Sequence, residues 1–269
     1  MNPSIVERIK SLPPLPKTLV DIQDICNRPD GSVSELSAVV EGDPMIVANL
    51  LKSANSPLYG FGKEIASVSQ AVSLFGMSMT RSIAISGSVK KLLKIDMAPY
   101  RVSPDQFADI STMQASLINK WFARVDPSKK DKLFLAALLQ ETGKIIIADE
   151  IIQGDEATLF ESEIAGTHNI AQVEYSFLEE TTASVAAAIF KYWGFDDELV
   201  NMILFSDQPQ KAPDELREYA YALNIVKSAV PVNSPLGETS IAIALKKAKD
   251  AGFDHEILED EIDALLEKH

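Results

Sequence analysis

The sequence predicts an all-α protein, a multi-helical bundle of about fourteen helices with no significant sheet. Nearly every segment begins with a helix-start signal, continues with apolar residues at positions i, i+3 and i+4, and ends with a stop signal. The alternation of apolar and polar residues that is typical of strands hardly occurs. With 269 residues, of which 46% are hydrophobic, the chain is long enough to bury a substantial core.

The first part of the chain, residues 1–95, is predicted to form an N-terminal helical subdomain of about five helices. It is entered through the rigid, extended segment Leu12-Pro-Pro-Leu-Pro16. Ser32 and Glu35 have the spacing of a capping box, and Asp43-Pro44 supplies an N-cap followed by a proline at the first helical position. Gly76 is expected to end a helix from about Val68, and a long helix then reaches about Leu93.

The remainder, residues 96–269, is predicted to form a second helical subdomain within the same module. Ser103-Pro-Asp-Gln106 repeats the order of cap, proline and glutamine and begins a helix to about Arg124. Pro127 is expected to open the next helix and Gly143 to close it. The further predicted helices cover about 144–152, 156–165, 169–178, 181–193, 197–205, 214–229, 238–250 and 254–268.

The charge of the chain disfavours nucleic acid as a partner. Its 25 Lys and Arg against 39 Asp and Glu give a net charge of −14 and a pI near 4.7. Such a field repels a phosphate backbone unless a local basic patch overcomes it. The chain has no apolar run of about 20 residues, as a membrane span requires, and its first 20 residues do not resemble a secretory signal. We therefore expect a cytoplasmic protein with no membrane partner.

Sequence signatures of catalysis are missing. The three histidines have no metal-site spacing, and neither a G-x-S-x-G elbow nor a Gly-rich phosphate loop occurs. Cys26 is the only cysteine, so an internal disulfide and a cysteine-based zinc site are excluded. Its apolar neighbours Ile22 and Ile25 favour a buried, inert thiol over a nucleophile.

Four stretches together resemble the HDOD domain family over about residues 5–205. They are LPPLPKTLVDIQDI, VSELSAVVEGDPMIVANLLKSANSPLYG, IASVSQAVSLFGMSMTRSIAI and LFLAALLQETGKIII. The resemblance implies an all-helical bacterial signalling module related to the HD-type metal phosphohydrolases, and its N-terminal half is the more specific. In those hydrolases, imidazole and carboxylate ligands hold a metal pair that generates hydroxide and binds the phosphate oxygens.

The positions where the resemblance implies metal ligands carry other residues in this chain. The His-Asp pair of HD hydrolases falls on Gln140 and Glu141, and the other histidines fall at or near Ile110, Thr182 and Phe205-Ser206. Because a glutamate alone does not hold a divalent ion, we expect no metal, no cofactor and no enzymatic activity. In the last turn of a helix, Gln140 and Glu141 can instead bond backbone groups or water, although a small-molecule pocket at this place stays open.

The expected function is therefore non-catalytic signal transduction through contacts with other signalling proteins. Partner identity, input signal and oligomeric state cannot be read from the sequence. Two alternatives stay open: a metal-dependent nucleotide phosphohydrolase or phosphodiesterase with atypical ligands, and a non-catalytic regulator that binds nucleotides or nucleic acid.

The turn-rich loop at 55–62 is the candidate interaction loop. Leu58, Tyr59 and Phe61 are expected to be partly exposed there and to be available for contacts. Asn55 and Ser56 have a competing role, which we favour, as a turn that caps the preceding helix.

Overall fold

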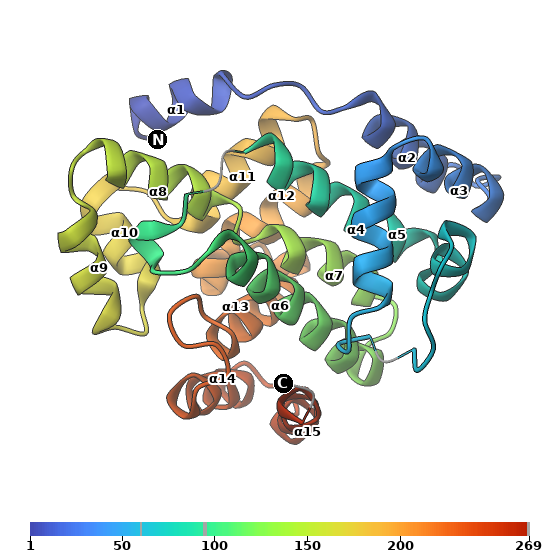
Figure 1. Cartoon of the computed structure of the whole chain (residues 1–269). Helices are drawn as coiled ribbons and strands as arrows, with labels where there is room; N and C mark the ends of the chain where they lie inside the picture. Colours follow the sequence, from blue (N-terminus) through green and yellow to red (C-terminus); the bar gives the residue numbers. More distant parts are fainter. Residues whose placement is uncertain (60, 94–95, 268–269) are drawn as a thin grey trace. The chain divides into compact units, whose positions relative to one another are not determined.

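A computed structural model describes residues 1–59, 61–93 and 96–267, and these ranges contain helices and loops but no strand. The predicted all-α class is confirmed, with fifteen α-helices and three short 3-10 helices in the described ranges (Figure 1). The α-helices are α1 (Pro3–Lys10), α2 (Lys17–Asn27), α3 (Val33–Glu41), α4 (Pro44–Ala54), α5 (Val68–Leu92), α6 (Pro104–Val125), α7 (Lys130–Leu139), α8 (Gly143–Gln153), α9 (Ala157–Ala165), α10 (Ile170–Leu178), α11 (Thr182–Tyr192), α12 (Asp197–Leu204), α13 (Asp214–Ala229), α14 (Glu238–Asp250) and α15 (His255–Leu266). None of the described helices is long and apolar enough to cross a membrane.

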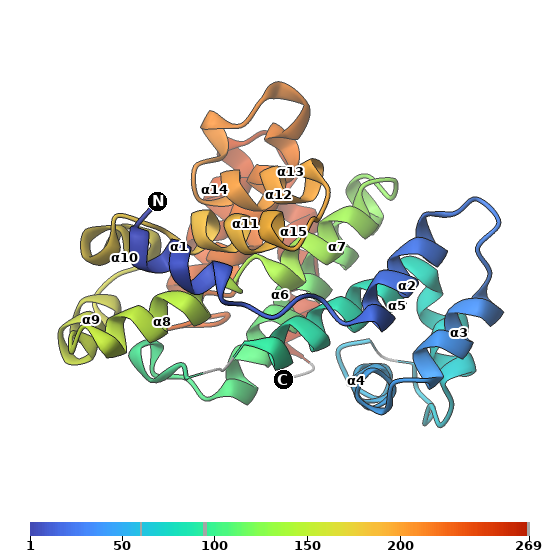
Figure 2. The same cartoon turned by 90° about the horizontal axis from the view of Figure 1, so that it is seen from above.

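The chain divides into two compact units. The smaller unit is formed by the described residues of 13–93, and the larger unit is formed by Met1–Leu12 together with the residues described from 96 to 267. The sequence assigned residues 1–12 to the first subdomain, whereas the structure packs α1 against α8 and α11 (Figure 2). The reason lies in the two faces of α1: Ile5 and Ile9 are buried, and Arg8 forms ion pairs with Asp149 and Glu150.

The smaller unit contains α2 to α5, and its helix boundaries follow the predicted signals. Ser32 forms the expected capping box with Glu35, and the Asp43 carboxylate accepts hydrogen bonds from the first backbone amides of α4. Gly76 has a φ of 75° and interrupts α5, so the predicted end of a helix at this glycine is confirmed. Helix α4 lies along α5 (Figure 1).

Several helix pairs pack closely in the larger unit, among them α6 with α7 and α8 with α11. Ser103 and Gln106 form the predicted capping box at the start of α6. The core of α6 includes Trp121 and Phe122, whose rings meet edge to face and are both fully buried. Helix α13 contacts α6, α7 and α12, and α14 packs on α13.

The prediction for the boundaries around α7 was wrong at both ends. Helix α7 begins at Lys130 rather than Pro127, and Gly143 does not close it but is the first residue of α8. A Cβ on Gly143 would lie 2.2 Å from the carbonyl oxygen of Thr182 and 2.8 Å from the amide nitrogen of Ala186. The glycine is therefore required by the close approach of α8 to α11 and not by a positive φ.

Candidate functional site: a lysine-centred ion-pair cluster in a cavity

The larger unit contains a cavity of about 670 Å³, and only some of the residues singled out by sequence line it. Glu141 and Thr182 do, and Gln140 is buried directly beside Glu141. Ser206 is fully buried but outside the lining, and Phe205 is half-buried and also outside it. Ile110 lines a separate cavity.

Helix α6 reaches the site through Gln114, one turn after Ile110. The side-chain amide of Gln114 donates to Glu141 Oε1 (3.1 Å) and to the carbonyl oxygen of Val230 (2.9 Å). Its Oε1 accepts a hydrogen bond from Gln140 Nε2 at 2.8 Å. The sequence analysis placed the contribution of this helix near Ile110. Gln114, which is fully buried, lies on the same helix face, and a polar residue on that face was the signal in the sequence that pointed to it.

The centre of the site is Lys144, which the sequence analysis did not identify. Its Nζ lies 2.9 Å from Glu141 Oε2 and 3.1 Å from Glu174 Oε1, and it donates to Thr182 Oγ1 at 2.8 Å. All four side chains are at most 4% exposed. One ammonium group thus bridges two buried carboxylates that come from α10 and from the turn before α8.

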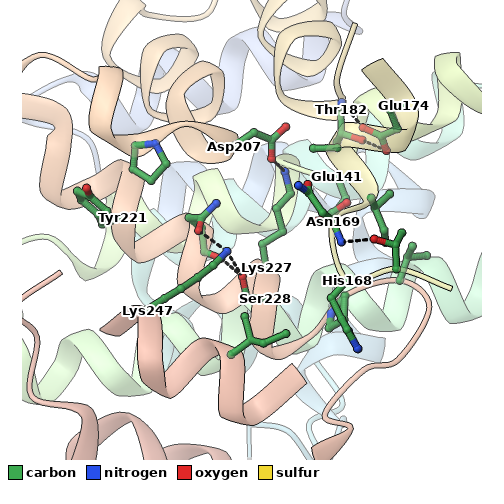
Figure 3. A pocket seen from close by; sticks show the side chains of 18 of the residues that line it. Glu141, His168, Asn169, Glu174, Thr182, Asp207, Tyr221, Lys227, Ser228 and Lys247 are labelled. Carbon is green, nitrogen blue, oxygen red and sulfur yellow. Dashed lines mark hydrogen bonds and ion pairs between the residues drawn. The ribbon is translucent and has the colours of Figure 1, made fainter. Parts of the chain in front are cut away.

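Glu174 connects this cluster to two further elements. Its Oε1 accepts hydrogen bonds from Tyr100 Oη (2.9 Å) and Thr182 Oγ1 (2.6 Å), and its Oε2 accepts one from the backbone amide of Thr182 (2.6 Å). Thr182 is the first residue of α11, so the carboxylate also faces the positive end of that helix dipole (Figure 3). Each Glu174 oxygen is therefore satisfied without water.

Burial and neighbouring charges act in opposite directions on the pKa values of Glu141 and Lys144. Burial alone would raise the pKa of Glu141, but the ammonium groups of Lys144 and Lys227 outweigh it and lower the pKa below its ordinary value. Burial alone would lower the pKa of Lys144, but Glu141 and Glu174 raise it above its ordinary value. Burial and the neighbouring Glu174 carboxylate raise the pKa of Tyr100, which stays a neutral donor.

A second ion pair, which is partly buried, also lines the cavity. Asp207 Oδ1 is 2.6 Å from Lys227 Nζ, and Asp207 Oδ2 accepts a hydrogen bond from the amide of Ala183 at 3.3 Å (Figure 3). Burial would raise the pKa of Asp207, but Lys227 holds it below its ordinary value. Sequence reasoning placed the last site position at Phe205-Ser206, and the residue that reaches the cavity is the next one.

The donor set does not fit the metal pair of HD-type hydrolases. The carboxylates of Glu141 and Glu174 already share the Lys144 ammonium, and a divalent cation placed between them would meet that positive charge. Of the polar groups beside them, Gln114 and Gln140 are neutral amides, and the Asp207 carboxylate is paired with Lys227. Within the ranges that the structure describes, no group of three or more His, Cys, Asp or Glu side chains could hold a metal ion.

The candidate interaction loop in the smaller unit is held by Asn55. The Asn55 amide donates to the carbonyl oxygens of Leu51 and Ile65 (both 2.9 Å), and its Oδ1 accepts from the Ile65 amide at 2.9 Å. Leu58 is buried, and Ser56 Oγ accepts from its amide at 3.3 Å. These bonds support the turn-forming role of Asn55 and Ser56.

The two aromatic residues of this loop are partly exposed, as the sequence predicted, whereas Leu58 is buried. Tyr59 and Phe61 both pack edge to face on Phe75, with centroids 5.0 and 5.2 Å from it, and both are half-buried. Their rings therefore help to hold the loop against α5.

Comparisons with known proteins agree with this fold. The family model described as HDOD domain matches residues 12–209. An uncharacterized protein of Treponema pallidum (strain Nichols) is 24% identical over 216 residues, which make up 80% of this chain and only 41% of the Treponema protein.

Two solved structures share the architecture. A protein from Shewanella amazonensis SB2B, described as a phosphohydrolase, has a TM-score of 0.73 and 21% identity, with 99% of this chain and 96% of that chain covered. A protein from Marinobacter aquaeolei VT8, described as a signal transduction protein, has a TM-score of 0.71 and 22% identity, with 97% of this chain and 58% of that chain covered. At these identities the likeness concerns the fold alone.

Proposed function

The chain belongs to the HDOD domain family, and from that premise we propose that it is a non-catalytic regulatory protein of bacterial signal transduction. Its action would consist of binding other signalling proteins rather than converting a substrate. The structural neighbour described as a signal transduction protein supports the regulatory part of the proposal, and the neighbour described as a phosphohydrolase represents the alternative.

The observation that carries the non-catalytic part is the position of Lys144. Its ammonium lies within 3.1 Å of both Glu141 and Glu174, at the place where the resemblance to HD hydrolases implies a metal ion. The interactions that a metal would make with these carboxylates are thus made by a side chain of the chain itself. A lysine supplies charge neutralisation there but neither a metal-bound hydroxide nor open coordination positions.

The non-catalytic part predicts that the full-length chain neither retains metal nor hydrolyses phosphate esters. The purified protein would be exposed to Mn²⁺, Fe²⁺ or Zn²⁺, desalted and analysed for metal content, and then assayed with a generic phosphomonoester and a generic phosphodiester. We expect substoichiometric metal and rates equal to those of a sample treated with chelator. Stoichiometric metal together with metal-dependent hydrolysis would establish the phosphohydrolase alternative instead.

The binding part predicts a contact surface on the smaller unit. Large apolar side chains are exposed there, among them Met45 at 46% and Leu74 at 48%, and exposed side chains of this kind are candidates for a contact surface. We expect a protein captured reproducibly by the full-length chain to bind about tenfold or more weakly to Met45→Asp or Leu74→Asp.

The matched control is Leu159→Asp in the larger unit, since Leu159 is 58% exposed and its replacement adds the same charge to the same parent. Binding measured by titration with the identified partner should be unchanged in this variant. Equal affinity of all four proteins would contradict a contact surface at Met45 and Leu74.

A further inference from the structure

Two lysines enter the outer part of the cavity from neighbouring helices. Lys227 lies on α13 and Lys247 on α14, and both line the cavity (Figure 3). Lys227 is paired with Asp207, as described above. Lys247 Nζ donates to Asn224 Oδ1 and to Ser228 Oγ, both at 2.8 Å, and both acceptors are neutral.

Lys247 differs from the other lysines of the site because no carboxylate of the described residues forms an ion pair with it, although Asp207, the partner of Lys227, lies near enough to act on its charge. Asp250, one turn further along α14, also lines the cavity but forms its ion pair with Lys246. Burial lowers the pKa of Lys247, and repulsion by the positive charge of Lys227 lowers it further; the Asp207 carboxylate opposes both effects but does not outweigh them.

The inner and outer parts of the cavity are therefore charged differently. In the inner part, Lys144 is balanced by two carboxylates, Glu141 and Glu174. In the outer part, the two ammonium groups of Lys227 and Lys247 share one carboxylate, that of Asp207. An anion bound between them would remove the repulsion and replace the solvation that Lys247 loses on burial.

The rest of the outer wall is suited to a small organic molecule. The start of α10, with its N-cap Asn169, forms one side, so the positive end of a nine-residue helix faces the cavity. Apolar contacts are offered by Ile170, Val232 and Ile243. The volume of about 670 Å³ lies in the range of sites for drug-sized ligands, roughly 300–1,000 Å³.

We propose that this cavity binds a small organic phosphate of about nucleotide size, whose phosphate group is held by Lys247 and Lys227. Lysine serves as a point charge for phosphate, and the Ser228 hydroxyl, which donates to the carbonyl oxygen of Asn224 and accepts from Lys247, holds that ammonium group in place. A nucleic-acid polymer is disfavoured because the chain carries a net charge of −14, whereas a small ligand inside the cavity meets the local lysines. The ligand would give the proposed regulator an input, and its binding does not depend on whether the chain is catalytic.

The test measures phosphate binding by the full-length protein without metal. Inorganic phosphate and, separately, adenosine 5′-monophosphate would be titrated in the presence of EDTA at constant ionic strength, with isothermal titration and the melting temperature as readouts. We expect phosphate to raise the melting temperature more than chloride does, and the nucleotide to bind more tightly than phosphate. Lys247→Gln should weaken both affinities about tenfold or more, because it removes one charge-assisted hydrogen bond.

Lys249→Gln is the matched control, because Lys249 is exposed on the same helix and loses the same charge. Its affinities should equal those of the parent. The inference would be overturned by a lack of phosphate binding, or by equal weakening in Lys247→Gln and Lys249→Gln. If the nucleotide binds no more tightly than phosphate, the cavity makes no contact with the organic part of the ligand, and the proposal of an organic phosphate is contradicted.

The result of the phosphate-binding test can be distinguished from the result of the test of the proposed function. Metal-dependent hydrolysis of the nucleotide would contradict the non-catalytic proposal even where lysine-dependent binding persists in EDTA. Failure to bind phosphate would contradict only the ligand site and leave regulation through protein contacts in place.

Discussion

Lys144→Met is expected to lower the free energy of unfolding of the larger unit by about 3–5 kcal/mol. The substitution keeps most of the side-chain volume but removes the ammonium group that neutralises Glu141 and Glu174, which are 2% and 0% exposed. Each remaining carboxylate would then be charged and buried without its partner. Urea denaturation followed by tryptophan fluorescence reports on this unit, since Trp121 and Trp193 both lie in it.

The size of this effect should depend on pH in a defined direction. In the parent chain the pKa of Glu141 is below its ordinary value, so its contribution to stability is present above the unfolded pKa and is lost on acidification. In the variant, burial without a cation should raise the pKa of this carboxyl. Protonation would then remove the free-energy cost of burying an unpaired negative charge. The difference in stability between the two proteins should therefore shrink as the pH falls from above the ordinary pKa of glutamate, about 4.3, to below it.

The control for this variant is Lys132→Met, which removes an exposed lysine from the neighbouring helix α7. Lys132 Nζ lies 2.7 Å from Glu198 Oε2, but both side chains are more than 40% exposed. Its removal should cost less than about 1 kcal/mol. A similarly small loss in Lys144→Met, without the change with pH, would show that the buried cluster does not need its cation.

Gly143→Ala is expected to destabilise the larger unit by about 3 kcal/mol, at the upper end of the cost of overpacking. The added Cβ would lie 2.2 Å from the carbonyl oxygen of Thr182, which is backbone and cannot rotate away. Helices α8 and α11 would have to separate, and the Lys144 to Thr182 hydrogen bond, now 2.8 Å, crosses the same contact. The loss would be measured by urea denaturation of the full chain.

Gly166→Ala provides the comparison, because the same methyl group is added at the end of α9 with a negative φ of −96°. There the nearest atom would be the Glu163 carbonyl oxygen at 4.0 Å. We expect Gly166→Ala to be neutral or to stabilise the protein by up to about 1 kcal/mol. Equal stability of Gly143→Ala and Gly166→Ala would contradict the close approach of α8 to α11.

Local signals were sufficient for most of the helix boundaries. The capping boxes at Ser32 and Ser103, the Asp43-Pro44 start and the break at Gly76 occur where the sequence predicted them. Each is a bond or a backbone conformation within four residues, so it is encoded where it acts. The position of α1 was missed because it depends on contacts with α8 and α11, which are distant in sequence.

The candidate site was predictable only in part for the same reason. Gln140, Glu141 and Thr182 were identified from the resemblance, and Glu141 and Thr182 line the cavity beside the buried Gln140. The charges that give the cavity its character come from other helices and were missed, namely Lys144, Glu174, Asp207, Lys227 and Lys247. No spacing rule joins them, since they come from α8, α10, α13, α14 and the short 3-10 helix Phe205–Asp207 that follows α12.

The pattern of residues along the chain was enough to predict the helical class and most helix boundaries, and the resemblance to HD hydrolases implied that the imidazole ligands are missing. Which groups lie in their place depends on how the helices pack. An ammonium group can take the place of a metal ion only when folding buries it between carboxylates from separate elements. A lysine is left without an ion pair only when the acidic side chains near it pair with other lysines. Both conditions are facts of three-dimensional proximity, which short-range patterns along the chain do not contain.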